Sequence, residues 1–473
     1  MDSLYAKLAD ELTVSAAKGV LRSGDKLPSI REASQSRGVS VTTVKRAYQL
    51  LESRGMVEAR PNAGYYVKAR AAARLSLHPP EVALPSSLDG DVGRLVLDTL
   101  RAISVANALP FASPYPDPSL LPWRRVRQHV TDIARKYPQW SATDDLPPGD
   151  PELIRQIALA HMRGGLDVDP SQIVVTGGAT EAINLCLQAV ANPGDTIAVE
   201  SPLFYLMRQA IDRMRMRAVE VPTDPRTGID LAALADLAKR QRLDACLTMP
   251  NFQNPMGFSM PDDAKQALVR LAEAHDMPLI ENGVYNQLHH GAKPPATLKS
   301  FDRKGLVLHC SSFSKCLTSA TRVGWAIPGR YRDKVESLKI LSGLSTSAIT
   351  QMAIARYLAR DNWEHHLRGV RQQLAQRMAI MRASVLRLFP AGTRVSEPSG
   401  GFILWVELPP QVDSLALYKA ALESAITVAP GRFFSQNLSR NCIRLNCSYP
   451  WTNRLEAGIR QLGCIATRLL SEA

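Results

Sequence analysis

From about Leu109 to the C-terminus, short apolar runs of strand length alternate with longer segments of helical periodicity. These runs are residues 173–176, 196–199, 245–248, 278–280 and 306–308. Because such alternation is typical of strands joined by covering helices, it predicts an α/β domain with a mostly parallel sheet over residues 109–473. Ligands of such sheets gather at the carboxyl ends of the strands, so the residues that follow each run are candidate site residues.

The chain of 473 residues is too long for one ordinary domain, and with 45% apolar residues it can bury a large core. No apolar run approaches the ~18 residues of a membrane span, and the N-terminus lacks the layout of a signal peptide. The seven cysteines contain no Cys-x-x-Cys pair. These features predict a cytoplasmic protein with reduced thiols, no metal site and no membrane partner.

The formal net charge of +13 is unevenly distributed. Residues 1–70 carry 12 Lys and Arg against 7 Asp and Glu, which is a higher density of net positive charge than in the rest of the chain. Such an excess is typical of nucleic-acid-binding modules, although a solvated basic surface gives the same count.

The first seventy residues carry the signals of three helices and a hairpin. Leu4, Leu8 and Leu12 recur at helical spacing, and a short second helix is expected over residues 29–36. Ser40 is a good N-cap for a third helix that ends near Arg54. Residues 56–60 and 65–67 alternate like two strands. This order predicts a winged helix-turn-helix, with a small helical bundle for protein contacts as the less favoured alternative.

The segment resembles a GntR-type DNA-binding domain in residues 27–33 (Leu-Pro-Ser-Ile-Arg-Glu-Ala), 38–44 (Gly-Val-Ser-Val-Thr-Thr-Val), 47–55 and the wing at 64–67. The resemblance covers essentially all of residues 1–70 and implies double-stranded operator DNA as a partner. It implies DNA contacts from Ser29, Arg31, Ser40, Thr42, Thr43, Lys45 and Gly64. Val41 departs from the family, because many relatives carry Arg there and one expected DNA contact is therefore missing.

A linker is expected between the two regions. Residues 69–90 are rich in Ala, Arg and Pro, which is typical of linkers. Asp91 to Val105 is partly periodic and is expected to form a helix. The sequence thus predicts a DNA-binding domain over 1–70, a linker with a possible helix over 71–108, and the α/β domain over 109–473.

The segment from Ser311 to Gly324 follows a strand-like run and combines hydroxyls, a lone lysine and an arginine. Lys315 can condense with an aldehyde to form a Schiff base. Ser312, Ser314 and Arg322 can hold a phosphate, the arginine in bidentate fashion. For this pattern alone, a solvated loop lysine is the common alternative.

Similar motifs follow the other strand-like runs. Residues 176–180 open a helix and expose backbone N–H groups that suit a phosphate. Phe204 can stack on a flat ring, and Asn254 lies in a turn stiffened by Pro and Gly, where its amide can bond a phenolic oxygen. Asn282 and Tyr285 lie three residues apart after the next run. A tight turn or core packing explains each motif alone, but together they indicate pyridoxal 5′-phosphate (PLP) as the cofactor.

The region from about Leu109 onward resembles fold type I aminotransferases on these motifs. The resemblance implies that Lys315 is the Schiff-base lysine, that Phe204 stacks on the ring, and that Asn254 and Tyr285 bond the ring hydroxyl. It implies phosphate contacts from Gly178, Ala179, Thr180, Ser312, Ser314 and Arg322. It also assigns Arg444 to the α-carboxylate of a ligand; a strand arginine in an ion pair is the alternative.

The most informative departure from that family is Asn282, where catalytic members carry Asp. The Asp carboxylate keeps the pyridine nitrogen protonated, whereas an amide can only hydrogen-bond that nitrogen. The sequence therefore predicts retained cofactor binding with weak or absent transamination. Residues 141–145 also lack the Tyr-Gly that relatives often have before Gly149.

The whole chain resembles the MocR group of transcriptional regulators, which join these two domains. The resemblance implies a homodimer that reads two operator half-sites. Our hypothesis is that the protein senses PLP or a small amino effector through Lys315. A PLP-dependent aminotransferase with an accessory DNA-binding domain is the alternative; Asn282 argues against it and Arg444 for it. A large domain that only dimerises would leave Lys315 without a role.

Overall fold

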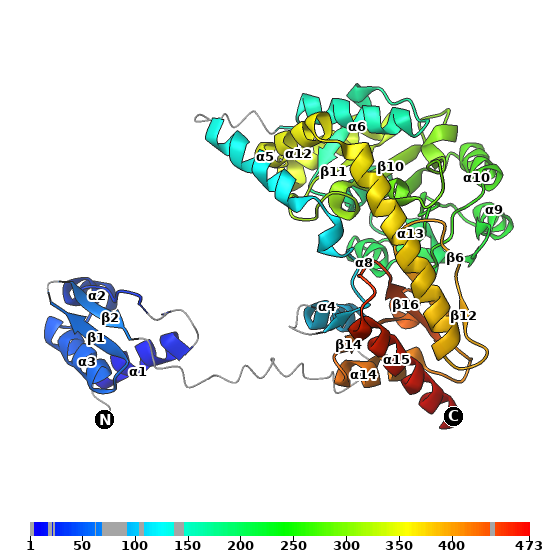
Figure 1. Ribbon diagram of the computed structural model, residues 1–473. Coiled ribbons are helices and arrows are strands. Elements are labelled where there is room, and N and C mark those ends of the chain that lie inside the picture. The colour runs from blue at the N-terminus through cyan, green and yellow to red at the C-terminus, as the bar shows by residue number, and fades with distance from the viewer. Residues whose placement is uncertain are drawn as a thin grey trace. The chain divides into compact units, whose positions relative to one another are not determined.

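In a computed structural model, the chain divides into two compact units, Met1–Val82 and Ala83–Ala473 (Figure 1). The structure describes residues 4–17, 21, 24–61, 63–68, 92–103, 108–136, 146–435 and 440–473. Residues 141–145 and most of the predicted linker lie outside these ranges. Within them, no helix is long and apolar enough to cross a membrane, and no cluster of His, Cys, Asp or Glu side chains suits a metal ion.

The first unit is a three-helix bundle with a β-hairpin. Its elements are α1 (Leu4–Ala17), α2 (Ile30–Arg37), α3 (Val41–Ser53), β1 (Val57–Arg60) and β2 (Gly64–Val67). Val44, Tyr48 and Leu51 give α3 its buried face. Ser29 and Ser40 accept backbone N–H bonds at the starts of α2 and α3, which fixes where both helices begin. The predicted winged helix-turn-helix order is confirmed.

The second unit is built on an eight-stranded sheet with the order β4-β11-β10-β9-β8-β5-β6-β7. The strands are β4 (Val174–Thr176), β5 (Thr196–Ser201), β6 (Arg217–Asp224), β7 (Gly228–Ile229), β8 (Ala245–Thr248), β9 (Leu279–Asn282), β10 (Val307–Ser312) and β11 (Gly324–Ile327). The run from β10 to β6 is parallel, and β11 is antiparallel to both β10 and β4. The predicted mostly parallel α/β sheet is therefore confirmed.

Helices cover both faces of this sheet, which explains why β4, β5, β8, β9, β10 and β11 are buried along their whole length. The helices are α5 (Trp123–Lys136), α6 (Pro151–Arg163), α7 (Ala179–Val190), α8 (Tyr205–Arg213), α9 (Leu231–Arg240), α10 (Asp262–His275), α11 (Arg332–Gly343) and α12 (Ala348–Arg360). Val174 and Ile280 pack with α7, α8 and α11, whereas their neighbours Val175 and Leu279 belong to the cores on the other face, with α6, α10 and α12. Successive strand residues thus serve opposite layers.

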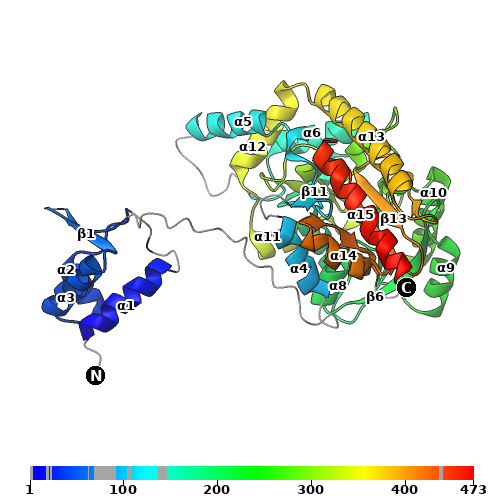
Figure 2. The ribbon, with the colours of Figure 1, turned by 60° about the horizontal axis from the view of Figure 1, so that its bottom comes forward.

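A smaller sheet with the order β12-β13-β16-β15 completes the second unit. Its region contains α4 (Val92–Ile103), β3 (Leu109–Pro110), β12 (Arg394–Val395), β13 (Ile403–Glu407), α14 (Ser414–Glu423), β14 (Ile426–Thr427), β15 (Ala429–Pro430), β16 (Cys442–Asn446) and α15 (Asn453–Ser471). The long helix α13 (Trp363–Leu388) packs its first half on the large sheet and its second half here, beside α15 (Figure 2).

The helix expected between Asp91 and Val105 is present as α4. It packs into the second unit, because Val96 is buried in that unit's core and Thr99 Oγ1 lies 3.0 Å from Tyr418 OH. This helix therefore belongs by its contacts to the unit that follows it.

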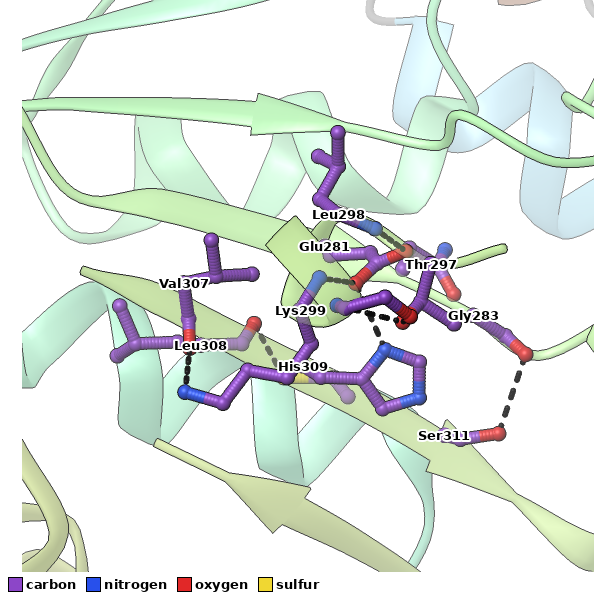
Figure 3. A network of polar contacts seen from close by, with 12 residues as sticks. Glu281, Gly283, Thr297, Leu298, Lys299, Val307, Leu308, His309 and Ser311 are labelled. Atoms are coloured by element: carbon purple, nitrogen blue, oxygen red, sulfur yellow. Dashed lines mark hydrogen bonds and ion pairs between the residues drawn. The ribbon is translucent and has the colours of Figure 1, made fainter. Parts of the chain in front are cut away.

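A buried polar network lies beneath the carboxyl ends of β9 and β10 (Figure 3). Glu281 is fully buried and accepts hydrogen bonds from Leu298 N at 2.9 Å and Lys299 N at 3.2 Å. His309 Nδ1 lies 2.9 Å from the same carboxylate. Ser311 Oγ donates to Gly283 O at 3.2 Å, so β10 is tied to the turn that follows β9.

His161 of α6 extends this network toward the helices. Its ring lies 5.2 Å from the His309 ring, and its Nε2 accepts a hydrogen bond from Trp325 Nε1 at 3.0 Å. Burial, and secondarily the neighbouring His309, lowers the pKa of His161 to about 3. His161 is therefore neutral in the folded protein near neutral pH.

We expect His161 to make folding sensitive to acid. The unfolded chain takes up this proton near pH 6.5, whereas the folded protein resists it down to about pH 3, so the free energy of unfolding falls as the pH drops below about 6.5. In His161→Gln an amide oxygen can still accept from Trp325 but does not titrate. Its Tm, measured by circular dichroism, should fall less between about pH 7.5 and about pH 5 than that of the wild type.

The control for this measurement is His275→Gln, which changes an exposed histidine at the end of α10. Its Tm should fall between the two pH values by as much as that of the wild type. An equal fall in His161→Gln would contradict the assignment of this acid sensitivity to His161.

Candidate functional site

Lys315 lies in a pocket at the carboxyl ends of the central strands. It ends a short 3-10 helix (Phe313–Lys315) that directly follows β10. The lining includes ten of the predicted cofactor residues: Ala179, Thr180, Phe204, Asn254, Asn282, Tyr285, Ser312, Ser314, Lys315 and Arg322. These residues follow β4, β5, β8, β9 and β10, so the parallel sheet brings together positions that are up to 143 residues apart, from Ala179 to Arg322.

One side of the pocket combines the start of α7 with Arg322. α7 begins at Ala179, and Gly178 before it provides no side-chain cap for the helix N-terminus. Arg322 donates from Nη2 to Gly177 O at 3.1 Å and from Nη1 to Ser314 Oγ at 3.4 Å. A Cβ at Gly178 would lie 2.5 Å from Arg322 Nη2, so glycine is needed for the guanidinium to lie here. A helix N-terminus, hydroxyls and a guanidinium together suit a phosphate.

The Lys315 amine is held by a segment far away in the sequence. Its Nζ donates to Pro114 O at 2.8 Å and lies 4.0 Å from the centre of the Tyr115 ring. Burial first, and then the positive charges of Arg444 and Arg322, lower the pKa of Lys315 to about 7. A large fraction of the amine is therefore unprotonated, and so nucleophilic, at neutral pH.

The opposite side of the pocket carries amides and a phenol. Tyr285 is fully buried, and burial raises its pKa despite its hydrogen bond with Asn254. Asn282 ends β9 with 6% of its surface exposed, and its Oδ1 accepts from Val284 N at 3.4 Å. None of the described residues that line the pocket carries a carboxylate. The predicted Asp-to-Asn departure therefore has no acidic substitute in the described lining.

Arg444 lies behind Asn254 and is not among the described residues that line the pocket. It is fully buried on β16, where Nη1 donates to Asn254 Oδ1 at 3.2 Å and Nη2 donates to Ala112 O. Its Nε has no partner among the described residues. In this arrangement Arg444 orients Asn254, and these two bonds engage two of its five N–H groups.

Pro114 and Tyr115 line the pocket but were not predicted from the sequence. Their contact with Lys315 joins an irregular segment to a strand end 201 residues away. Proline-rich irregular segments have no periodicity that predicts which surface they contact. No signal in the sequence identified them.

In the first unit, the predicted DNA residues divide into two groups. Ser29, Ser40 and Thr43 take part in local bonds at the starts of α2 and α3, including Ser40 Oγ to Thr43 Oγ1 at 2.8 Å. Arg31, Thr42, Lys45 and Gly64 are exposed. Val41, in place of the family's arginine, is 50% exposed at the first position of α3.

Known proteins resemble both units. Residues 4–67 match the model of "Bacterial regulatory proteins, gntR family", and residues 127–461 match that of "Aminotransferase class I and II". The HTH-type transcriptional regulators YdcR and YjiR of Escherichia coli are 40% and 36% identical to this chain. Each alignment covers 97% of this chain and 98% of the relative.

Among solved structures, LysN, an α-aminoadipate aminotransferase of Thermus thermophilus complexed with N-(5′-phosphopyridoxyl)-L-leucine, is 25% identical with a TM-score of 0.73. The match covers 81% of this chain and 96% of LysN. This chain therefore belongs to the MocR-type family, in which a GntR-type DNA-binding domain is fused to an aminotransferase class I and II domain.

Proposed function

We propose that this protein is a cytoplasmic transcriptional regulator that binds PLP and senses either PLP or a small amino compound through Lys315. The observation that carries this proposal is the Lys315 pocket, which combines a nucleophilic amine with a helix start that suits an anion. The described lining of this pocket contains no carboxylate. The exposed start of α3 in the same chain supplies a surface for DNA. The fusion of the two domains supports a link between ligand binding and transcription.

The lining residues fit PLP by their chemistry. Ala179, Thr180, Ser312, Ser314 and Arg322 would hold the phosphate, together with Gly178. Phe204 would stack on the ring, Asn254 and Tyr285 would bond its hydroxyl oxygen, and Asn282 its nitrogen. When bound, the cofactor would supply an aldehyde for amines and a ring that accepts electrons. Lys315 would supply the amine, which contacts Pro114 O and the Tyr115 ring.

A second candidate function is PLP-dependent transamination with DNA binding as an accessory activity. The similarity to aminotransferases and the buried Arg444 near the pocket favour it. Asn282 opposes it, because an amide does not hold a proton on the ring nitrogen as a carboxylate does. We therefore expect weak or absent turnover.

We infer that the protein acts as a homodimer on two operator half-sites. Ile340, Leu341 and Leu344 at the end of α11 are 45%, 80% and 54% exposed, and such a patch on a large domain is typical of a protein interface. A symmetric dimer would present two helix-turn-helix units, which matches the two-fold symmetry of many operators.

Reductive trapping tests the role of Lys315. After incubation with PLP and borohydride, peptide mapping of the wild type should find the cofactor on Lys315, because its amine is the nucleophile in the pocket. Lys315→Ala should lose this label, whereas Lys293→Ala, which removes an exposed lysine, should keep it. A wild-type protein without label on Lys315 would show that the cofactor proposal is wrong.

Asn282→Asp tests whether the missing carboxylate limits catalysis. The new carboxylate should raise the pKa of the ring nitrogen by about 1–3 units and increase the consumption of amino donors by about tenfold or more. Turnover is measured with a panel of amino acids and a keto acid acceptor. Wild-type turnover as fast as that of Asn282→Asp would favour the aminotransferase function.

Lys45→Ala tests the DNA-binding surface. On a duplex from upstream of the protein's own gene, the variant should bind more weakly, and the salt dependence of its affinity should fall by about 1 in slope because one phosphate contact is lost. Lys7→Ala removes an exposed charge from α1 and is the matched control. Equal effects of both variants in fluorescence anisotropy would contradict a specific role for α3.

A further inference from the structure

Residues 112–117, called the strap here, pass beside Lys315, and two of them, Pro114 and Tyr115, line its pocket. Asn446 Nδ2 donates to Ser113 O at 2.9 Å and to Tyr115 O at 2.7 Å. Ser448 Oγ accepts from Asp117 N at 2.8 Å, and Arg444 donates to Ala112 O. Every second side chain of a strand points to the same face, so residues 444, 446 and 448 lie on one face of β16 and its extension. This face holds the strap.

The other side of the strap faces Lys315. Pro114 O accepts from Lys315 Nζ, and the Tyr115 ring lies beneath the same nitrogen at 4.0 Å. Tyr115 is 43% exposed, so its ring contributes much less to the core than a buried aromatic residue does. The role of the Tyr115 side chain is therefore better sought in its contact with the Lys315 amine than in core packing.

We propose that Tyr115 is a positioning residue that, together with Pro114 O, stabilises the protonated Lys315 amine beside its positively charged neighbours. These contacts are released when Lys315 condenses with an aldehyde. This inference rests on the proposed function of Lys315 and adds a residue that tunes it. The face of an aromatic ring attracts a cation, and a carbonyl oxygen accepts from it, so both groups favour the ammonium form.

The charged surroundings of Lys315 explain why such support matters. Arg322 after the 3-10 helix and Arg444 on β16 both repel an ammonium at this position. Tyr115 and Tyr285 are the other titratable residues of the described lining, and burial raises the pKa of Tyr285, which keeps it neutral near neutral pH. With no carboxylate in the described lining, the strap provides the favourable contacts that the ammonium has in the described structure.

Condensation with an aldehyde removes N–H groups of Lys315 that can contact the strap. The neutral amine attacks the carbonyl carbon, a carbon–nitrogen double bond forms, and the carbonyl oxygen leaves as water with the two amine protons. The product nitrogen has no hydrogen to donate to Pro114 O, or a single one if it takes up a proton. The strap therefore loses contacts with Lys315 when the lysine reacts.

The test compares full-length wild type, Tyr115→Leu and Tyr115→Phe, each freed of bound carbonyl compounds. Condensation of Lys315 with pyridoxal is trapped with cyanoborohydride across a pH series and quantified by peptide mass spectrometry. Loss of the ring should destabilise the ammonium, so Tyr115→Leu should shift the midpoint of the pH profile down by about half a unit and raise trapping at about pH 6 by about threefold. Tyr115→Phe keeps the ring face and should follow the wild type.

A ring that only covers the pocket would change the trapping rate in Tyr115→Leu at high pH, where the amine is neutral in every variant, and would leave the midpoint unchanged. That result would overturn the inference. Equal shifts in Tyr115→Leu and Tyr115→Phe would overturn it as well, because they would assign the effect to the hydroxyl. If Lys315 is unlabelled at every pH in the wild type, the proposed function itself fails.

Discussion

The close approach of two glycines determines where Arg322 lies in the Lys315 pocket. Gly324 begins β11 beside Gly178, and a Cβ at position 324 would lie 2.6 Å from the Gly178 carbonyl carbon. Glycine at this position therefore lets β11 run antiparallel between β4 and β10. Two residues earlier, Arg322 adopts a φ of 51° and reaches Gly177 and Ser314. The place of the guanidinium thus follows from a contact between two backbones.

The parallel sheet explains how much of the pocket could be predicted from the sequence. Each strand-like run ends next to a residue with cofactor chemistry, and parallel strands end at the same edge, so motif order alone brought Phe204, Asn254, Asn282 and Lys315 together. The same rule could not predict the depth of each side chain. Arg444 was assigned to a ligand carboxylate, yet it is fully buried and bonded to Asn254.

The contacts of irregular segments such as the strap could not be predicted from the sequence, and the reason is physical. The buried face of a strand or helix can be predicted from the periodicity of its apolar residues. The strap is instead positioned by backbone carbonyls that accept hydrogen bonds from Arg444 and Asn446. Any residue type has such a carbonyl, so the sequence has no signal for it. The packing of α4 was missed for a related reason, since its short apolar face predicts a helix but not its partner.

The distribution of charge in the Lys315 pocket suits the proposed sensing function better than it suits catalysis. Lys315, Arg322 and Arg444 bring positive charge together without a carboxylate in the described lining, so an anionic ligand is favoured and a protonated ring nitrogen is not. A catalyst needs that proton for turnover, whereas a sensor needs only a ligand that binds one conformation better than another. In the proposed function Lys315 would meet the second requirement, because condensation would remove at least two of the three N–H groups with which its ammonium can contact the strap. The absence of the carboxylate that an aminotransferase needs is compatible with covalent sensing.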